Sequence, residues 1–196
     1  MMQKVVEQLT GKQLVRTLET YLEENIESFA EVRSRYAKAV ERLRNEGSVM
    51  VPSVGDVVDA IEKQTASNLF FSGVLGIKAN LDHFMDPMAR TVLDVDFDVF
   101  LREETASRLP AYEKAQMVID AFYVLLTPTQ KDLFSDILDY ISYLETTGPK
   151  LAHYYGFILG NEILPNLVPG YYQDHVLTVQ YRAMLARYLG PSGLKK

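Results

Sequence analysis

His153 and Glu162 are ionisable residues in the most apolar predicted helix, 149–164. Burial shifts the pKa of such groups, which is how a helical-bundle enzyme holds an acid and a base. Nine positions on one helix, however, separate the two by about 13 Å along the axis and about 180° around it. They cannot reach the same substrate atom. We therefore expect a histidine that donates to a backbone carbonyl and a glutamate at an exposed helix end.

Three aspartates alternate with apolar residues at Asp94, Asp96 and Asp98. Alternate carboxylates open the Ca²⁺ loop of an EF-hand, where they converge on one cation. That loop needs glycine at its sixth position and glutamate at its twelfth, and this sequence has valine and threonine there. We predict no metal site here, and we interpret 86–98 as an irregular acidic connector that ends in a helix cap at Asp98. A short strand is the alternative, because the alternation has a period of two.

The other histidines supply no ready ligand set. His83 and His175 each follow an aspartate, and adjacent residues on a helix do not face each other. The sequence also lacks the short motifs typical of di-iron, zinc, nucleotide-binding and serine-hydrolase sites. These observations favour a noncatalytic role and predict no cofactor. A metal-dependent hydrolase is a further alternative, and it requires the acidic triplet or the histidines to converge in space.

The C-terminal half is rich in tyrosine, which combines an apolar ring with a polar hydroxyl. Such a cluster lines a ligand cavity, forms an interface or borders the core. As a binding hypothesis, we place a pocket for a small apolar ligand between the helix of His153 and the last helix. The candidate ligand-binding residues are His153, Tyr155, Glu162 and Tyr181.

The composition is that of a globular protein, with 196 residues of which 47% are hydrophobic and 23% charged. A net charge of -6 argues against nonspecific nucleic-acid binding, which needs a clustered excess of Lys and Arg. The lack of cysteine excludes thiolate chemistry and suits the reducing cytoplasm. The first residues do not resemble a secretory signal, and no apolar stretch reaches the roughly 20 residues that span a bilayer. We expect a cytoplasmic protein that binds neither nucleic acid nor membrane.

Residues 11–46 contain no proline and carry apolar residues at steps of three, four or seven, which predicts one long amphipathic helix. Its charges are ordered, acidic over 19–31 and basic over 33–44. Antiparallel pairing of two copies sets each acidic block beside a basic one, so we predict a homodimer, or a complex with another protein. Ion pairs within one chain are the alternative. The candidate interface residues are Leu18, Leu22, Phe29 and Tyr36.

Caps and prolines divide the rest of the chain. Ser53 with Asp56, and Thr127 with Gln130, form capping pairs that predict helix starts. Prolines predict further boundaries, because proline suits the first turn of a helix and disrupts its interior. The expected helices are 53–83, one from 99, 110–126, 128–146, 149–164 and 172–189, so that C-terminal helices occupy about 99–189.

Two glycine pairs stand in apolar helices, Gly73 with Gly76 and Gly156 with Gly160. Glycine in a helix costs about 1 kcal/mol relative to alanine, so buried pairs on one face predict a close helix crossing. The sequence as a whole predicts a single-domain, all-α bundle of six or seven helices over residues 1–196, with one long N-terminal helix.

Overall fold

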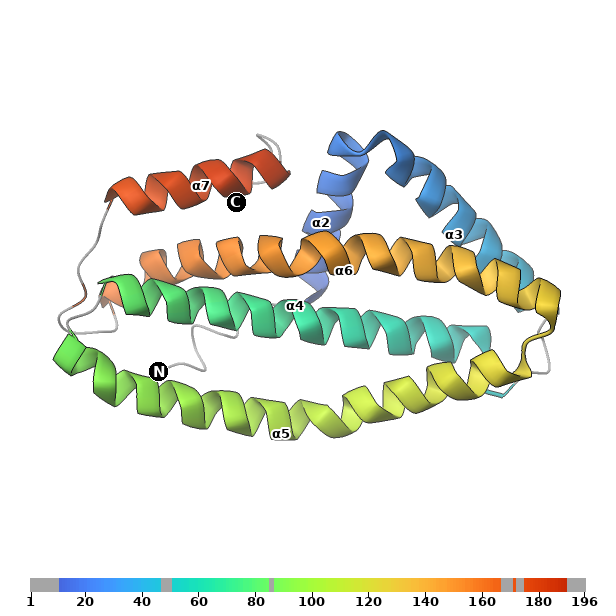
Figure 1. The fold of residues 1–196 in the computed structure, drawn as a ribbon, viewed down its shortest axis with the longest axis horizontal. Helices are drawn as coiled ribbons and strands as arrows, with labels where there is room; N and C mark the ends of the chain where they lie inside the picture. The colour runs from blue at the N-terminus through green and yellow to red at the C-terminus, as the bar shows by residue number, and fades with distance from the viewer. Residues whose placement is uncertain (1–10, 47–50, 85–86, 167–170, 172–174, 190–196) are drawn as a thin grey trace.

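The computed structural model describes residues 11–46, 51–84, 87–166, 171 and 175–189. The regular elements in these ranges are helices, so the predicted all-α bundle is confirmed (Figure 1). None of these helices is both long and apolar enough to cross a bilayer. They are α2 (Gly11–Asn25), α3 (Glu27–Glu46), α4 (Val54–Phe84), α5 (Pro87–Leu125), α6 (Pro128–Ile163) and α7 (His175–Leu189), with a 3₁₀ turn at Leu164–Asn166.

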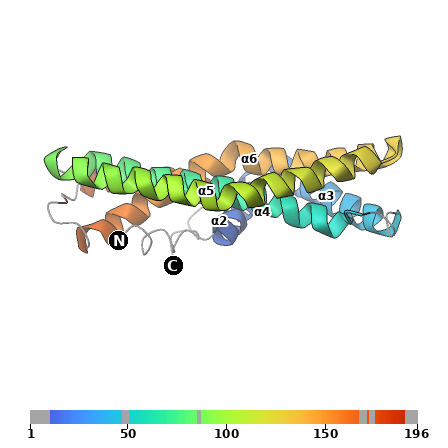
Figure 2. The ribbon, with the colours of Figure 1, turned by 90° about the horizontal axis from the view of Figure 1, so that it is seen from below.

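The three longest helices run lengthwise beside one another (Figure 1). α4 packs against α5 on one side and against α6 on the other. α2 and α3 form the two arms of a V that packs on α6 and α4, and α7 lies against α6. Figure 2 shows that α5 is the outermost helix, with no described element in front of it along its length.

α4 and α6 cross at the predicted glycines. A Cβ on Gly76 would overlap the carbonyl oxygen of His153, and a Cβ on Gly156 would overlap the carbonyl oxygen of Gly73. Both glycine pairs therefore belong to one crossing, in which the two backbones are in direct contact. The predicted close approach is confirmed.

A buried polar group is satisfied at the same crossing. The fully buried Asn80 donates from Nδ2 to the carbonyl oxygen of Phe157 at 2.8 Å. Its Oδ1 accepts from the Tyr171 hydroxyl at 2.5 Å, and this hydroxyl also lies 3.1 Å from Oδ1 of Asn161. Gly160 leaves room for the amide, because a Cβ there would lie 3.2 Å from the Asn80 side chain. These hydrogen bonds join Tyr171 to both α4 and α6.

The predicted helix over 11–46 is interrupted at Ile26, so the expectation of one long N-terminal helix was wrong. The Ile26 amide donates to the Leu22 carbonyl at 3.0 Å, but the Phe29 amide donates to the Ile26 carbonyl at 2.9 Å, a tighter three-residue turn. Leu18 and Leu22 of α2 and Phe29 of α3 belong to one buried cluster. The bend lets both arms pack on the same core.

The segment 87–98 is helical, which corrects both the predicted irregular connector and the alternative strand. Pro87 occupies the first turn of α5, where its missing amide hydrogen has no helical partner to lose. Phe97 is buried, and Ala115 and Phe122 continue its line along the inner face of α5. Residue 86 lies outside the described residues.

Pro110 and Pro149 lie inside α5 and α6, so the helix starts predicted at these positions were wrong. Proline removes one backbone hydrogen bond and bends a helix, and α5 is bowed in Figure 1. Gly148 does not end a helix either. A Cβ there would lie 2.6 Å from Cδ2 of Leu69 and 2.9 Å from Cδ2 of Leu18, so the glycine permits close packing.

Both predicted capping pairs are confirmed. The Ser53 amide donates to Oδ2 of Asp56 at 2.8 Å, and the Asp56 amide donates back to Oγ of Ser53 at 3.2 Å. Thr127 and Gln130 make the equivalent reciprocal bonds, at 3.0 Å and 3.4 Å. Local hydrogen bonding thus sets the starts of α4 and α6.

Candidate functional site

α6 and α7 meet through aromatic rings at the place of the predicted ligand pocket. Tyr181 stacks on Phe157 with centroids 3.5 Å apart and planes 12° apart, and it meets Tyr154 edge to face at 5.7 Å. Glu162 is exposed, as expected, and its Oε1 lies 2.5 Å from Nη2 of Arg182. Both Tyr181 and Glu162 therefore attach α7 to α6.

His153 and Tyr155 lie on the same helix but are directed differently. Burial lowers the pKa of the half-buried His153, whose ring lies 6.4 Å from that of Tyr154. Burial raises the pKa of Tyr155, which packs against the core, and the charge of Glu162 raises it further. None of the four candidate ligand residues lines the hollow between α2, α3, α4 and α6 that is described below.

The acidic triplet lies on α5. Asp94 and Asp98 are four residues apart and share a helix face, whereas Asp96 lies about 160° around the axis from both. The side chains of Asp94 and Asp96 are outside the described ones, and Asp98 is exposed. Among the side chains that the structure describes, no three His, Asp or Glu residues are grouped to hold a metal ion.

The apolar stripe of 11–46 faces the core of its own chain. Leu18, Leu22 and Phe29 are fully buried, and the half-buried Tyr36 stacks on Tyr140 with centroids 4.3 Å apart. The first three side chains have no exposed surface to offer a second copy. The structure thus gives them a packing role within the chain in place of the predicted interface.

Two arginines of the basic block pair within the chain. The bend at Ile26 brings Arg33 of α3 to Glu23 of α2, and the two form an ion pair. Arg35 places Nη1 2.8 Å from Oδ1 of Asp136 and Nη2 3.5 Å from Oδ2 of Asp139, both on α6. For these arginines, the alternative of ion pairs within one chain is confirmed.

The bend also creates a hollow of about 540 Å³, which we call the well. Its walls are α2 from Arg16 to Glu19, α3 from Arg33 to Tyr36 and one face of α4 over 58–66. Its floor is the face of α6 formed by Ile137, Tyr140, Ile141 and Leu144. A concave site of this volume has the dimensions typical of small-molecule sites, and here charged side chains stand around an apolar floor.

A stack of three aromatic rings stands at the well. Tyr140 lies between Phe29, whose centroid is 5.9 Å away, and Tyr36, whose centroid is 4.3 Å away. The planes differ by 25° and 21°. Because Phe29 is buried and Tyr36 lines the well, Tyr36 is the end of the stack that faces the hollow.

Glu19 is hydrogen-bonded to this stack, since it accepts from the Tyr140 hydroxyl. Burial raises the pKa of Tyr140, and the hydrogen bond to Glu19 raises it further. Burial also raises the pKa of Tyr36, with added contributions from Glu62 and Glu19 that Arg44 opposes. Both tyrosines are therefore neutral at physiological pH.

The well combines residues that no local sequence motif connects. Tyr36 and Tyr140 stand out in the sequence, the first in the apolar stripe and the second in the tyrosine-rich half. Arg16, Glu19 and Glu62 give no such signal, because they come from α2 and α4 and only the tertiary fold brings them to one hollow.

Comparisons with known proteins add no relative. No family model, no curated protein and no solved structure matches this chain.

Proposed function

We propose that this chain is a noncatalytic cytoplasmic protein that acts by self-association, and that two copies pair through the outer face of α5. The observation that carries the proposal is the apolar stripe on that face. Pro110, Met117 and Val124 follow one another at intervals of seven, and Met117 and Val124 are 71% and 78% exposed. Ala106 and Ala121 lie one turn from this line and are also exposed.

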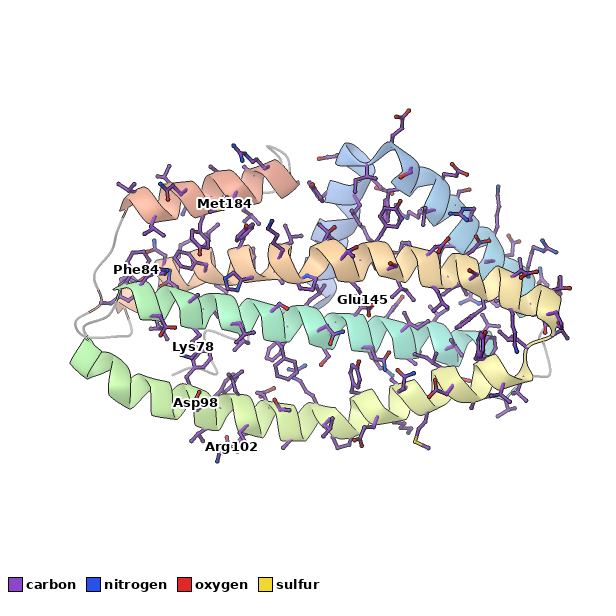
Figure 3. The ribbon with its side chains drawn as sticks, in the orientation of Figure 1. Lys78, Phe84, Asp98, Arg102, Glu145 and Met184 are labelled. Atoms are coloured by element: carbon purple, nitrogen blue, oxygen red, sulfur yellow. The ribbon has the colours of Figure 1, made fainter. Side chains whose placement is uncertain are left out.

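The stripe lies opposite the face that packs on α4. On the inner face, Phe97 is buried and the Lys78 amine of α4 lies 5.9 Å from its ring centroid. Figure 3 shows Arg102 on the side of α5 directed away from α4. Apolar residues on an outer helix face are typical of a helix that docks on another helix.

The order of residues in the stripe favours a second copy as the partner. Four of the five stripe residues are symmetric about the point between Glu113 and Lys114. In an antiparallel pair with its two-fold axis at that point, Ala106 faces Ala121, Pro110 faces Met117 and Glu113 faces Lys114 of the other copy. These apolar residues then meet apolar residues and opposite charges meet at the centre, whereas Val124 meets Glu103.

The shape of α5 supports the same axis. The helix is bowed away from α4, and its convex side is the outer side (Figure 1). Two convex helices touch near their middles, and Pro110 of the stripe lies near the middle of α5. The cysteine-free sequence supports a reducing cytoplasmic location.

Mass measurement by light scattering after size exclusion, over a range of concentrations, tests the proposal. We expect a dimer that Met117→Glu dissociates, because the change buries a charge in the stripe. The matched control is Val179→Glu on α7, a position 64% exposed and outside the stripe, which leaves the dimer intact.

Charge reversal tests the two-fold axis. Lys114→Glu and Glu113→Lys each set like charges together across the axis and weaken the dimer, whereas the double variant restores opposite charges and recovers it. A monomer at every concentration overturns self-association. A dimer that resists Met117→Glu, or a double variant as weak as the single ones, overturns this interface.

A further inference from the structure

We propose that the well binds a small organic cation, an ammonium group carried on an apolar body. The site shares no residue with the outer face of α5, so it stands independently of the dimer. Its floor is apolar, its inner wall carries the exposed end of an aromatic stack, and a carboxylate is bonded to that stack. Each of these features matches one part of such a ligand.

The aromatic stack supplies the surface for the cation. The face of a tyrosine ring carries partial negative charge and attracts ammonium groups, which is why cages of aromatic rings recognise them. Tyr36 presents its ring at the well while Tyr140 supports it from behind, so the ring is held in place by packing. A held ring loses little conformational entropy when a ligand binds.

The placement of charges favours a cation over an anion. Six charged residues line the well, three acidic and three basic. Of these six, Glu19 is half-buried, whereas the other five are exposed. The basic group of Arg33 is already paired with Glu23. The least hydrated charge at the site is therefore a carboxylate, and it lies beside the tyrosines.

The apolar floor supplies the remaining affinity. Ile137, Ile141 and Leu144 lie on one face of α6, and Val58 and Ile61 face the same hollow from α4. Burial of hydrocarbon contributes about 25 cal/mol per Å² of apolar surface removed from water. A ligand with an apolar body is bound here more tightly than a bare ammonium ion.

NMR titration of the full chain with benzyltrimethylammonium tests the proposal, with benzenesulfonate and benzyl alcohol as the anionic and neutral probes. We expect saturable shifts at Tyr36, Tyr140 and neighbouring residues for the cation, and binding at least about tenfold weaker for the other two probes. Equal binding of benzenesulfonate, or no saturable shift with the cation, overturns the proposal.

Variants that remove a carboxylate charge test whether that charge is responsible for cation binding. Glu19→Gln keeps an oxygen that accepts from Tyr140 but removes the charge, and it weakens cation binding by about tenfold. Glu62→Gln, at an exposed position, also weakens cation binding, and it provides the test if Glu19→Gln does not fold. Glu24→Gln, the same change at an exposed position of α2 outside the well, is the matched control and leaves cation binding unchanged. If both glutamine variants of the well carboxylates bind the cation as the parent does, the proposal is wrong.

Discussion

The α-carbon of Gly76 faces the backbone carbonyl oxygen of His153 with no space for a methyl group between them. This contact joins the two central helices of the bundle, and the reciprocal contact of Gly156 with Gly73 repeats it one turn away. Backbone atoms in contact set the distance between α4 and α6 at this point. Any separation of the two helices would open the core on both sides of the crossing.

Gly76→Ala and Gly156→Ala should each lower the free energy of unfolding by about 3 kcal/mol or more, because the new methyl group forces the backbones of α4 and α6 apart. Urea denaturation followed by circular dichroism measures the change. Gly55→Ala is the matched control. A Cβ at Gly55 would have its nearest contact 3.6 Å away, at Oγ of Ser53, so we expect stability there to stay level or rise by up to about 1 kcal/mol. Equal melting of the three variants would refute the crossing.

Two kinds of feature could be predicted from the sequence. One is set by hydrogen bonds between residues close in the chain, and the other by the free-energy cost of a residue type inside a helix. The pair Thr127 and Gln130 predicts a helix start because their reciprocal bonds involve residues three apart. Gly73 and Gly76 predict a crossing because glycine in a buried helix requires a compensating contact. Neither inference needs knowledge of the rest of the chain.

The wrong predictions concern places where tertiary packing overrides a local signal. Pro110 and Pro149 are poor residues for a helix interior, yet the packing of α5 on α4 and of α6 on α4 continues on both sides of them. Ile26 carries no signal of a helix end, yet the helix bends there, and both arms pack on the same core. The well follows from that bend, so its lining could not be predicted either.

Asn80 should be more important for stability than its single side chain suggests. Asn80→Ala removes the bond to the Phe157 carbonyl and leaves the Tyr171 hydroxyl with Asn161 as its partner, and we expect it to cost about 2 to 3 kcal/mol. Tyr171→Phe removes one of these bonds and should cost about 1 kcal/mol. Asn45→Ala, at an exposed position on α3, is the control and should change stability by less than about 0.5 kcal/mol.

A double-mutant cycle identifies the bond itself. If Asn80 and Tyr171 act through their hydrogen bond, the effects of the two changes are not additive, because the second change has no bond left to remove. Additive effects would show that the two residues stabilise the fold separately.

Removal of divalent metal ions should leave the folded protein unchanged. Asp94 and Asp98 share one face of α5 and Asp96 lies on another, so the helix does not bring the three positions to one side. We expect the melting temperature to be the same after chelation and after addition of Ca²⁺ or Mg²⁺. A rise of several degrees with either ion that Asp96→Asn abolishes would establish a metal site on α5.

The half-buried imidazole of His153 should make stability depend on pH in a defined direction. Burial holds the pKa of His153 below its ordinary value of 6.5, whereas the unfolded chain exposes the ring and restores that value. Between the lowered pKa and 6.5, the unfolded state therefore binds more protons than the folded state. The contribution of His153 to stability is then fully present above pH 6.5 and is lost as the pH falls through this window. Urea denaturation of the parent and of His153→Gln, between about pH 5 and pH 7.5, isolates the effect as the difference in slope. His83→Gln, at an exposed position on α4, is the matched control and should keep the slope of the parent. If His153→Gln loses stability with acid as steeply as the parent does, burial of His153 is not the cause of the pH dependence.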